Sequence, residues 1–302
     1  MRILISGGSG LIGSALTTAL RSAGHDVGHL VRPGRSVDSA RAPGDVAWDP
    51  KSAKVDIAAM EGTDAIVHLG GANVADGRWT PARKEELRNS RIVSTRVLVD
   101  AMARLNRKPR VFVCASAVGY YGDRGEEIVT ESSSSGSDFL AFLARDWETE
   151  AMRASQGGIR TVLLRFGVVL TPLGGALPKM LGPFRWGLGG RLGSGRQWMP
   201  WVALEDAVNI ACAAIGDERW SGPLNVVAPN PVRNADFTRA LAAVLGRPAL
   251  FAVPVFALRM ALGEMAGALL ASERVMPERL LQVGYKFRRE RLEEALGEMG
   301  SR

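Results

Sequence analysis

A glycine-rich turn directly after the first apolar run constrains this chain more than any other feature. Ile3-Leu4-Ile5 is typical of a buried strand, and an amphipathic helical pattern begins at Leu11. Between them a first glycine permits a tight turn, a second lets a diphosphate approach the backbone, and a third lets helix and strand pack closely. The helix N-terminus adds free N–H groups and a positive dipole end. We therefore predict dinucleotide contacts at Gly7, Ser9, Gly10, Leu11, Ile12 and Gly13.

The spacing of these glycines leaves one alternative open. GxxGxxG differs from the GxGxxG pattern, and a glycine triplet alone also occurs in turns that hold no ligand. The position of the triplet, between a strand and a helix near the start of the chain, favours the ligand-binding interpretation.

Short apolar runs alternate with helical patterns over the first two-thirds of the chain. Several runs are apolar at consecutive positions, as expected of strands covered on both faces. The alternation predicts an α/β fold, a doubly wound parallel sheet (Rossmann fold) of roughly seven strands. We expect strands at Arg2–Ser6, Asp26–Val31, Ala65–Leu69, Arg110–Ala115, Arg160–Phe166 and Leu224–Val227. We expect helices at Leu11–Ala23, Thr80–Leu105, Phe139–Arg153 and Glu205–Ile215.

The composition changes after the fifth of these strands. Residues 171–203 are rich in Gly, Pro and Trp. In one interpretation, the tryptophans and cations of this segment bind an anionic or ring-bearing substrate by stacking and charge. In the other, the tryptophans pack the segment onto the core and the arginines face water. These residues are Lys179, Arg185, Trp186, Arg191, Arg196, Trp198 and Trp201. We predict a nucleotide-binding domain at 1–230, with 171–203 inserted as a pocket loop, and a smaller, mainly helical C-terminal substrate lobe at 231–302.

The end of the second predicted strand bears on cofactor choice. In NAD-binding folds this strand usually ends in Asp or Glu, which binds the ribose 2′-hydroxyl. Here Asp26–Val31 is followed by Arg32, with Arg35 beyond it. Guanidinium groups form bidentate, charge-assisted hydrogen bonds to phosphate. We therefore predict NADP(H) rather than NAD(H); the alternative is that both arginines are solvated loop charges.

Composition excludes several function classes. The chain has 302 residues, a net charge of +7 and 6% aromatic residues, and it lacks a dense basic run interleaved with aromatics. We therefore expect no nucleic-acid partner, and the positive charge suits a phosphorylated small molecule equally well. The three histidines and two cysteines are too scattered to predict a metal site.

Neither a secretory signal nor a membrane span is evident in the sequence. The longest apolar stretch, Phe251–Leu270, contains Pro254, Arg259 and Glu264. We expect a cytoplasmic protein with no membrane partner, and the sequence leaves its oligomeric state open.

Several motifs resemble a known family. GGSGLIG at 7–13, AIVHLGGAN at 65–73 and SAVGYYG at 116–122 resemble the extended short-chain dehydrogenase/reductase superfamily. More narrowly, the chain is similar to the atypical NAD(P)-dependent epimerase/dehydratase-like branch with a C-terminal domain of unknown function. Further matches are Arg78-Trp79-Thr80, Ser90-Arg91, Asp146-Trp147-Glu148, residues 165–170, Pro200-Trp201-Val202 and residues 277–281. The resemblance therefore spans nearly the whole chain.

The resemblance implies further cofactor contacts. Leu69 and Gly70 would line the adenine and ribose, and Val168 would lie near the nicotinamide. Glu86 and Arg91 match positions assigned to NADP contact in this branch. For Arg91, the alternative is an ion pair on a helix surface.

The catalytic centre of the superfamily combines a Ser or Thr with Tyr-x-x-x-Lys, whose tyrosine passes a proton. Ser116 matches the Ser/Thr position at a strand end. The expected helix has neither Tyr nor Lys, and Phe142 and Asp146 stand at the four-residue spacing. Tyr120 or Tyr121 is the candidate replacement for the phenol. The alternatives are that the tyrosines shape the pocket and that Ser116 is structural.

Two functions remain open at this point. The first is an NADP(H)-dependent oxidoreductase or epimerase-like enzyme acting on a small molecule, with nucleotide-linked compounds among the options. The second is a non-catalytic NADP(H)-binding sensor or partner-binding protein, motivated by the missing Tyr and Lys.

Overall fold

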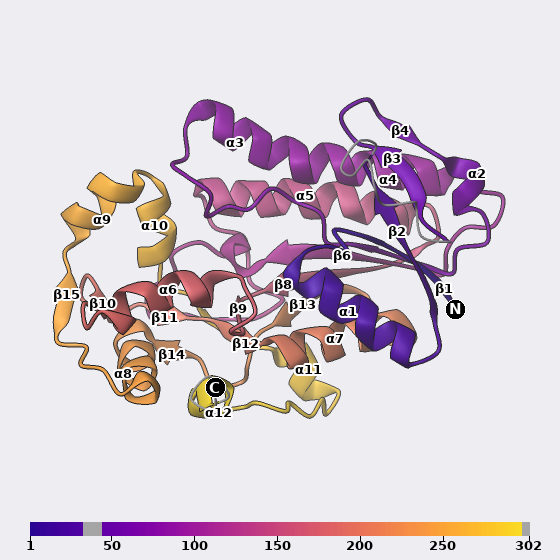
Figure 1. Ribbon diagram of the computed structural model, residues 1–302. Coiled ribbons are helices and arrows are strands. Elements are labelled where there is room, and N and C mark those ends of the chain that lie inside the picture. Colours follow the sequence, from indigo (N-terminus) through magenta and orange to yellow (C-terminus); the bar gives the residue numbers. More distant parts are fainter. Residues whose placement is uncertain (33–43, 298–302) are drawn as a thin grey trace.

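The computed structural model describes residues 1–32 and 44–297, which form an α/β fold (Figure 1). Among these residues, the main sheet has eight strands in the order β13-β8-β6-β5-β1-β2-β3-β4. All neighbouring pairs are parallel except β3 and β4. The strands are β1 (Arg2–Ser6), β2 (Asp26–Val31), β3 (Val46–Asp49), β4 (Lys54–Val55), β5 (Ala65–His68), β6 (Val111–Ala117), β8 (Arg160–Phe166) and β13 (Gly222–Val226). The predicted doubly wound parallel sheet is confirmed, with one short antiparallel strand added at its edge.

Strand β1 shows why the sheet is covered on both faces. Leu4 packs in the core under the helices drawn above the sheet in Figure 1, whereas Ile3 and Ile5 pack in the core under the helices below it. Because side chains alternate along a strand, an unbroken apolar run needs cover on both sides. The upper helices are α3 (Pro81–Arg88), α4 (Ser94–Ala103) and α5 (Phe139–Gln156), and the lower helices are α1 (Leu11–Ser22), α7 (Leu204–Gly216) and α11 (Glu278–Gln282).

The single helix predicted at Thr80–Leu105 is interrupted in the structure. A π-helical turn, η1 (Asn89–Val93), joins α3 to α4. The Ser94 hydroxyl contacts the carbonyl oxygens of Ser90 at 2.7 Å and Arg91 at 3.0 Å, within this turn. π-Turns often occur at functional sites. Here the turn places Ser90 and Arg91 against the loop that follows β5, where the Ala72 N–H donates to the Ser90 hydroxyl at 3.0 Å.

A lobe occupies the left of Figure 1 and has its own core, which includes Trp201, Phe237 and Leu241. Residues 171–203 are not an irregular loop, since they contain a helix and three short strands. The elements of the lobe and its junction are β9 (Val168–Leu170), α6 (Ala176–Arg185), β10 (Gly190–Leu192), β11 (Trp198–Met199), β12 (Trp201–Ala203), β14 (Val232–Arg233), α8 (Asn234–Leu245), β15 (Phe251–Val253), α9 (Val255–Leu262), α10 (Met265–Leu270) and α12 (Leu292–Gly297). Short elements elsewhere are α2 (Ile57–Met60), η2 (Val118–Tyr120), β7 (Ile128–Val129) and β16 (Arg274–Val275).

Candidate functional site

The glycine turn between β1 and α1 has a shape that only glycine permits. Gly7 has a φ of +73°, and its carbonyl oxygen accepts a hydrogen bond from the Gly10 N–H at 2.9 Å. A Cβ on Gly7 would lie 2.8 Å from the Leu69 carbonyl carbon, and one on Gly13 would lie 2.2 Å from the Gly7 carbonyl oxygen. Gly10 caps α1 without a side-chain hydrogen bond. The N–H groups of Leu11, Ile12 and Gly13, in the first turn of α1, have no partner within the helix. Ser9 is exposed within the glycine turn.

Three predicted cofactor segments come together beside this turn. The Leu69 N–H donates to the Ser6 carbonyl oxygen at 3.1 Å, which ties the end of β5 to the end of β1. Leu69 and Gly70 abut Gly7, and a Cβ on Gly71 would lie 3.1 Å from the Arg91 guanidinium carbon. We call Gly7–Gly13, Leu69–Gly71 and Arg91 the cofactor end. It lies between β1 and β5, where the strand order reverses, which is the point where doubly wound sheets bind ligands.

Arg91 has no carboxylate partner among the residues that the structure describes. Its guanidinium lies 3.4 Å from the Leu87 carbonyl oxygen and 5.3 Å from the centre of the Trp147 ring. Burial, together with the nearby charge of Arg83, lowers the pKa of Arg91 to about 10. The surface ion pair considered for Arg91 is thus absent. A withdrawn cation without a counter-ion, next to an open helix N-terminus, suits an anionic ligand.

The other predicted cofactor residues lie on separate elements of the fold. Glu86 is exposed on α3 and pairs with Arg83. Val168 is half-buried just past the end of β8, and its N–H donates to the Pro200 carbonyl oxygen at 2.8 Å. Arg32 directly follows β2 and is exposed, whereas Arg35 lies outside the described residues.

A buried histidine beneath the glycine turn was missed by the sequence analysis. His68 is fully buried at the end of β5, where its ring bonds to the Ser6 hydroxyl on one side and lies 3.0 Å from the Ser94 hydroxyl on the other. Burial and then the charge of Arg91 lower the pKa of His68 to about 3. The ring is therefore neutral and links β1, β5 and α4. A histidine inside the apolar run Ala65–Leu69 was the available signal.

Ser116 belongs to a buried polar cluster at the end of β6. It is 4% exposed, and its hydroxyl donates to the Glu148 carboxylate at 2.6 Å. Arg165 holds the same carboxylate with two hydrogen bonds of 2.8 and 2.7 Å. Burial alone would lower the pKa of Arg165, but the hydrogen bonds and charge of Glu148 outweigh it and raise that pKa. The Ser116 hydroxyl is thus part of a hydrogen-bond network with Glu148 and Arg165.

The two adjacent tyrosines differ in exposure. Tyr121 is fully buried, its hydroxyl donates to the Asn225 side chain at 2.7 Å, and it accepts from Arg165 at 2.8 Å. Burial raises the pKa of Tyr121 to about 12. This environment argues for a structural role. Tyr120 is half-buried, with its ring centre 3.6 Å from the Arg165 guanidinium carbon. We call Ser116, Tyr120, Tyr121, Glu148 and Arg165 the reaction end.

Strand register explains how the reaction end assembles. Ser116 pairs with Arg165 across β6 and β8, and Arg165 pairs with Asn225 across β8 and β13. The three polar side chains therefore form a row at the ends of adjacent strands. Sequence reasoning missed Glu148, Arg165 and Asn225 as site residues. Their signal was polarity within otherwise apolar strands and a helix, but only the fold shows that they meet.

The helix α5 confirms that the superfamily's Tyr and Lys are absent. Phe142 is 39% exposed and packs under the Arg145 guanidinium, whose carbon lies 5.0 Å from the ring centre. Asp146 pairs with Arg88 of α3 at 3.1 Å. These positions therefore make surface contacts instead of supplying a phenol and an ammonium group.

The tryptophans of residues 171–203 do not gather around one cavity. Trp201 is 1% exposed and packs in the lobe core. Trp198 lies between the guanidinium groups of Arg233 and Arg274, each 4.6 Å from its ring centre. Trp186 is exposed at the end of α6. Packing therefore explains two of the three.

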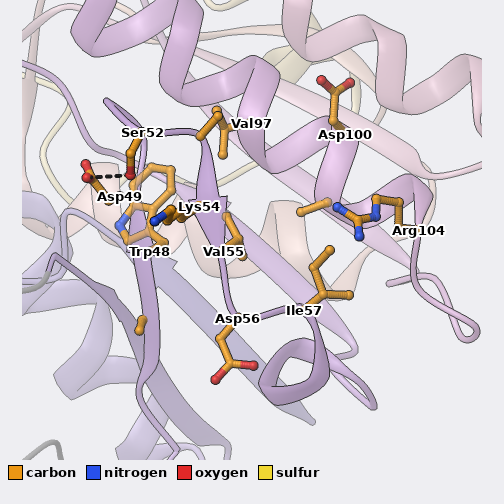
Figure 2. Close-up of a pocket in the computed structure, with 13 residues that line it drawn as sticks. Trp48, Asp49, Ser52, Lys54, Val55, Asp56, Ile57, Val97, Asp100 and Arg104 are labelled. Carbon is orange, nitrogen blue, oxygen red and sulfur yellow. Dashed lines mark hydrogen bonds between the residues drawn. The ribbon is translucent and has the colours of Figure 1, made fainter.

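A groove of about 900 Å³ lies away from the predicted site, between the β3–β4 hairpin and α4 (Figure 2). Trp48, Lys54, Val97 and Arg104 line it from opposite sides, and none of the predicted site residues does. Across residues 1–32 and 44–297, no cluster of three His, Cys, Asp or Glu side chains is placed to hold a metal ion. Within the same ranges, no helix has the length and apolar character of a membrane span.

Comparisons with known proteins agree with this geometry. The NAD dependent epimerase/dehydratase family matches residues 3–226, and a domain of unknown function (DUF1731) matches residues 253–299. The epimerase family protein Mb2239 of Mycobacterium bovis is 45% identical over 299 residues, covering 98% of this chain and 96% of its own. The crystal structure of human epimerase family protein SDR39U1 (isoform 2) with NADPH has a TM-score of 0.89 and 34% identity, covering 99% of both chains.

A further solved structure has the same fold. The nucleoside-diphosphate sugar epimerase of Corynebacterium glutamicum has a TM-score of 0.79 and 37% identity, covering 99% of this chain and 58% of its own. The glycine turn, the sheet and the C-terminal segment all fall within these matches. The chain therefore belongs to the NAD-dependent epimerase/dehydratase family, within the extended short-chain dehydrogenase/reductases.

Proposed function

We propose that this protein binds NADP(H) at the cofactor end and exchanges hydride with a small-molecule substrate at the reaction end. The observation that carries the proposal is Arg91, a withdrawn cation without a carboxylate partner in the described structure, beside the glycine turn. A bound diphosphate would supply the missing negative charge and accept hydrogen bonds from the first turn of α1. The human relative crystallised with NADPH supports this assignment.

The preference for NADP(H) over NAD(H) rests on Arg32. This side chain is exposed just past β2, where a ribose 2′-phosphate would lie, and no acid occupies that strand end. The test is to titrate NADPH and NADH into the wild type, Arg32→Ala and the remote exposed control Arg219→Ala. Loss of a phosphate contact predicts roughly 10- to 100-fold weaker NADPH binding with little change for NADH. Equal losses for both cofactors would defeat the assignment.

At the reaction end, we assign the proton-transfer role to Tyr120, with Ser116 in support. Tyr120 is the more exposed of the two tyrosines, whereas the Tyr121 hydroxyl already has two buried partners. When bound, the nicotinamide supplies hydride chemistry, and the phenol would deliver the proton to the substrate oxygen. Tyr120→Phe should abolish turnover in a panel of carbonyl and sugar-nucleotide substrates without weakening NADPH binding. Tyr121→Phe is the matched control and should retain turnover, so the reverse pattern would refute the role.

The substrate class and the domain roles are part of the same proposal. The sugar-nucleotide epimerase among the relatives favours a nucleotide-linked substrate. The substrate would lie between a nucleotide-binding unit at 1–230 and the C-terminal lobe at 231–302, to which the inserted residues 171–203 contribute.

A second candidate is cofactor binding without turnover, as in a redox sensor. The specific observation in its favour is that the Ser116 hydroxyl points to Glu148 while Phe142 and Asp146 replace the usual pair. If NADPH binds tightly but no substrate of the panel oxidises it, this candidate replaces the first. Stoichiometric cofactor oxidation coupled to substrate reduction would exclude it.

A further inference from the structure

The far end of the lobe exposes large apolar side chains. Soluble monomers rarely expose such side chains together unless the surface binds something. Six of them are more than half exposed: Trp186 (83%), Leu188 (63%), Leu250 (87%), Phe251 (56%), Phe256 (67%) and Met260 (67%). We call these six residues the lobe patch.

Pairing of short strands brings the parts of the lobe patch together. β10 pairs with β15, with Gly190 opposite Phe251. Leu188 lies two residues before Gly190, and α9 follows β15 directly. A Cβ on Gly193 would lie 3.0 Å from the Val255 side chain at the start of α9. Figure 1 shows α9, β15 and β10 at the left end of the molecule, opposite the N-terminus.

The α9 part of the lobe patch is held in place by the nucleotide-binding half. The Arg78 side chain donates to the carbonyl oxygens of Met260 and Ala261, the former bond being short and the latter 3.1 Å. Lys84 of α3 pairs with Glu264 just past α9. The exposed side chains of α9 are therefore presented on a fixed element.

The two chain segments that carry the lobe patch are basic, and the nearby acids Asp76, Asp236 and Glu264 each form an ion pair with a cation. Residues 171–204 contain four cations and no acid, and residues 237–263 contain three arginines and no acid. Arg191, Arg247 and Arg259 are exposed next to the apolar side chains. A second copy docked on the same patch would set these arginines against their own counterparts, which repels. An anionic partner is complementary.

We propose that the lobe patch docks on the surface of a lipid bilayer that contains anionic lipids. Protruding Trp, Leu, Phe and Met side chains insert among fluid acyl chains without needing shaped pockets, and the arginines meet the headgroups. This contact is peripheral and needs no spanning helix, so it revises the expectation of no membrane partner, which rested on the missing span. It is independent of the reaction proposed above.

The experiment is flotation of the full-length protein with vesicles of phosphatidylcholine alone or mixed with phosphatidylglycerol. The proposal predicts binding to the mixed vesicles, weaker binding in high salt, and a blue shift of tryptophan fluorescence that Trp186→Phe reduces. Failure to float with the mixed vesicles at low salt would overturn it.

Paired variants distinguish binding through the lobe patch from non-specific binding of the protein surface to vesicles. Phe256→Ser/Met260→Ser should weaken partitioning by at least about tenfold, and Arg259→Glu by roughly fivefold or more. The controls are Leu281→Ser/Val283→Ser, exposed on and after α11, and Arg219→Glu after α7, and both should bind like the wild type. Equal losses in the controls would contradict the proposal. So would sedimentation that shows a dimer which Phe256→Ser/Met260→Ser dissociates, since the patch would then join two copies.

Discussion

The cofactor end and the reaction end each contain an arginine withdrawn from water, but only one of the two has a carboxylate partner. Arg165 is held by Glu148 through two hydrogen bonds, and the pair also engages Ser116 and Tyr121. Arg91 lies against backbone and the Trp147 ring, and no acid of the described chain pairs with it. The pKa of Arg165 is accordingly raised and that of Arg91 lowered.

This difference separates an ion pair that is satisfied within the protein from a cation that is available to an anionic ligand. A buried ion pair whose hydrogen bonds are satisfied within the protein asks nothing of a ligand. A half-buried cation without a carboxylate partner destabilises the free protein, and binding of an anion removes that cost. The charge of Arg91 is therefore available to an anionic ligand. At the reaction end, Arg165 and Glu148 satisfy each other, and the half-buried Tyr120 is the group proposed to meet the substrate.

The largest expected effect is on the reaction end. Arg165→Met leaves the Glu148 carboxylate buried without its cation, which should lower the free energy of unfolding by about 3–5 kcal/mol in urea titrations. Folded Arg165→Met protein should still bind NADPH with wild-type affinity, because Arg165 lies outside the cofactor end.

A double variant tests the same ion pair if the single variant does not fold. Glu148→Leu/Arg165→Met removes both charges and should recover much of the lost stability. A loss below about 1 kcal/mol in Arg165→Met would show that the pair is not the buried element described.

The second-largest expected effect is on NADPH binding at the cofactor end. Arg91→Met should weaken NADPH binding roughly 10- to 100-fold, since one charge-assisted contact is lost, while the free energy of unfolding stays equal or rises. The matched control is Arg96→Met. Arg96 lies five residues further along the helix, is exposed and pairs with Glu150, so this variant should bind NADPH normally. If Arg91→Met destabilised the free protein as much as Arg165→Met, the contrast between the two ends would be broken.

The smallest effect is a pH dependence from His68 beneath the glycine turn. The folded state keeps this ring neutral down to a pKa of about 3, whereas the unfolded chain takes up a proton below about 6.5. The unfolded state thus binds more protons as pH falls, so folded stability is lost from pH 6.5 downward. At about pH 5.5 the loss is about 1.4 kcal/mol relative to pH 7.5.

His68→Gln tests this contribution by difference. Urea unfolding at the two pH values should show a wild-type loss larger than that of His68→Gln by that amount, because other titrating groups cancel between the two proteins. Identical pH profiles would mean that His68 is not held neutral in the folded state.

Much of the sheet was predictable because its strands are long and apolar on both faces. Arg2–Ser6, Asp26–Val31 and Arg160–Phe166 were predicted with the bounds that the structure has. β3 and β4 were missed, since four and two residues are too short for a hydrophobic period to stand out. The π-turn within Thr80–Leu105 was also not predictable from the sequence. It is accompanied by a hydrogen bond from the distant Ala72 N–H to the Ser90 hydroxyl and by one from the Ser94 hydroxyl to the Ser90 carbonyl oxygen, and a helical period shows neither contact.

The two ends of the site were predictable to different degrees. The glycine turn of the cofactor end follows from local chain chemistry, since Gly7, Gly10 and Gly13 are close in sequence and their roles are steric. Arg91 and residues 69–71 of the same end are distant in sequence, and only the family resemblance pointed to Leu69, Gly70 and Arg91. The reaction end joins Ser116 to Glu148, 32 residues away, and Arg165 to Tyr121, 44 residues away. Only strand register and helix packing bring those groups together. The sequence therefore suggested Ser116 and Tyr121 as reactive groups but did not reveal that their hydroxyls form hydrogen bonds with Glu148 and Arg165.

A crystal structure of the protein grown with NADPH would show directly whether the glycine turn and Arg91 hold the cofactor. We predict that the diphosphate lies against the N–H groups at the start of α1, with the Arg91 guanidinium facing the cofactor. An empty glycine turn, or NADPH lodged instead in the groove between the β3–β4 hairpin and α4, would contradict it.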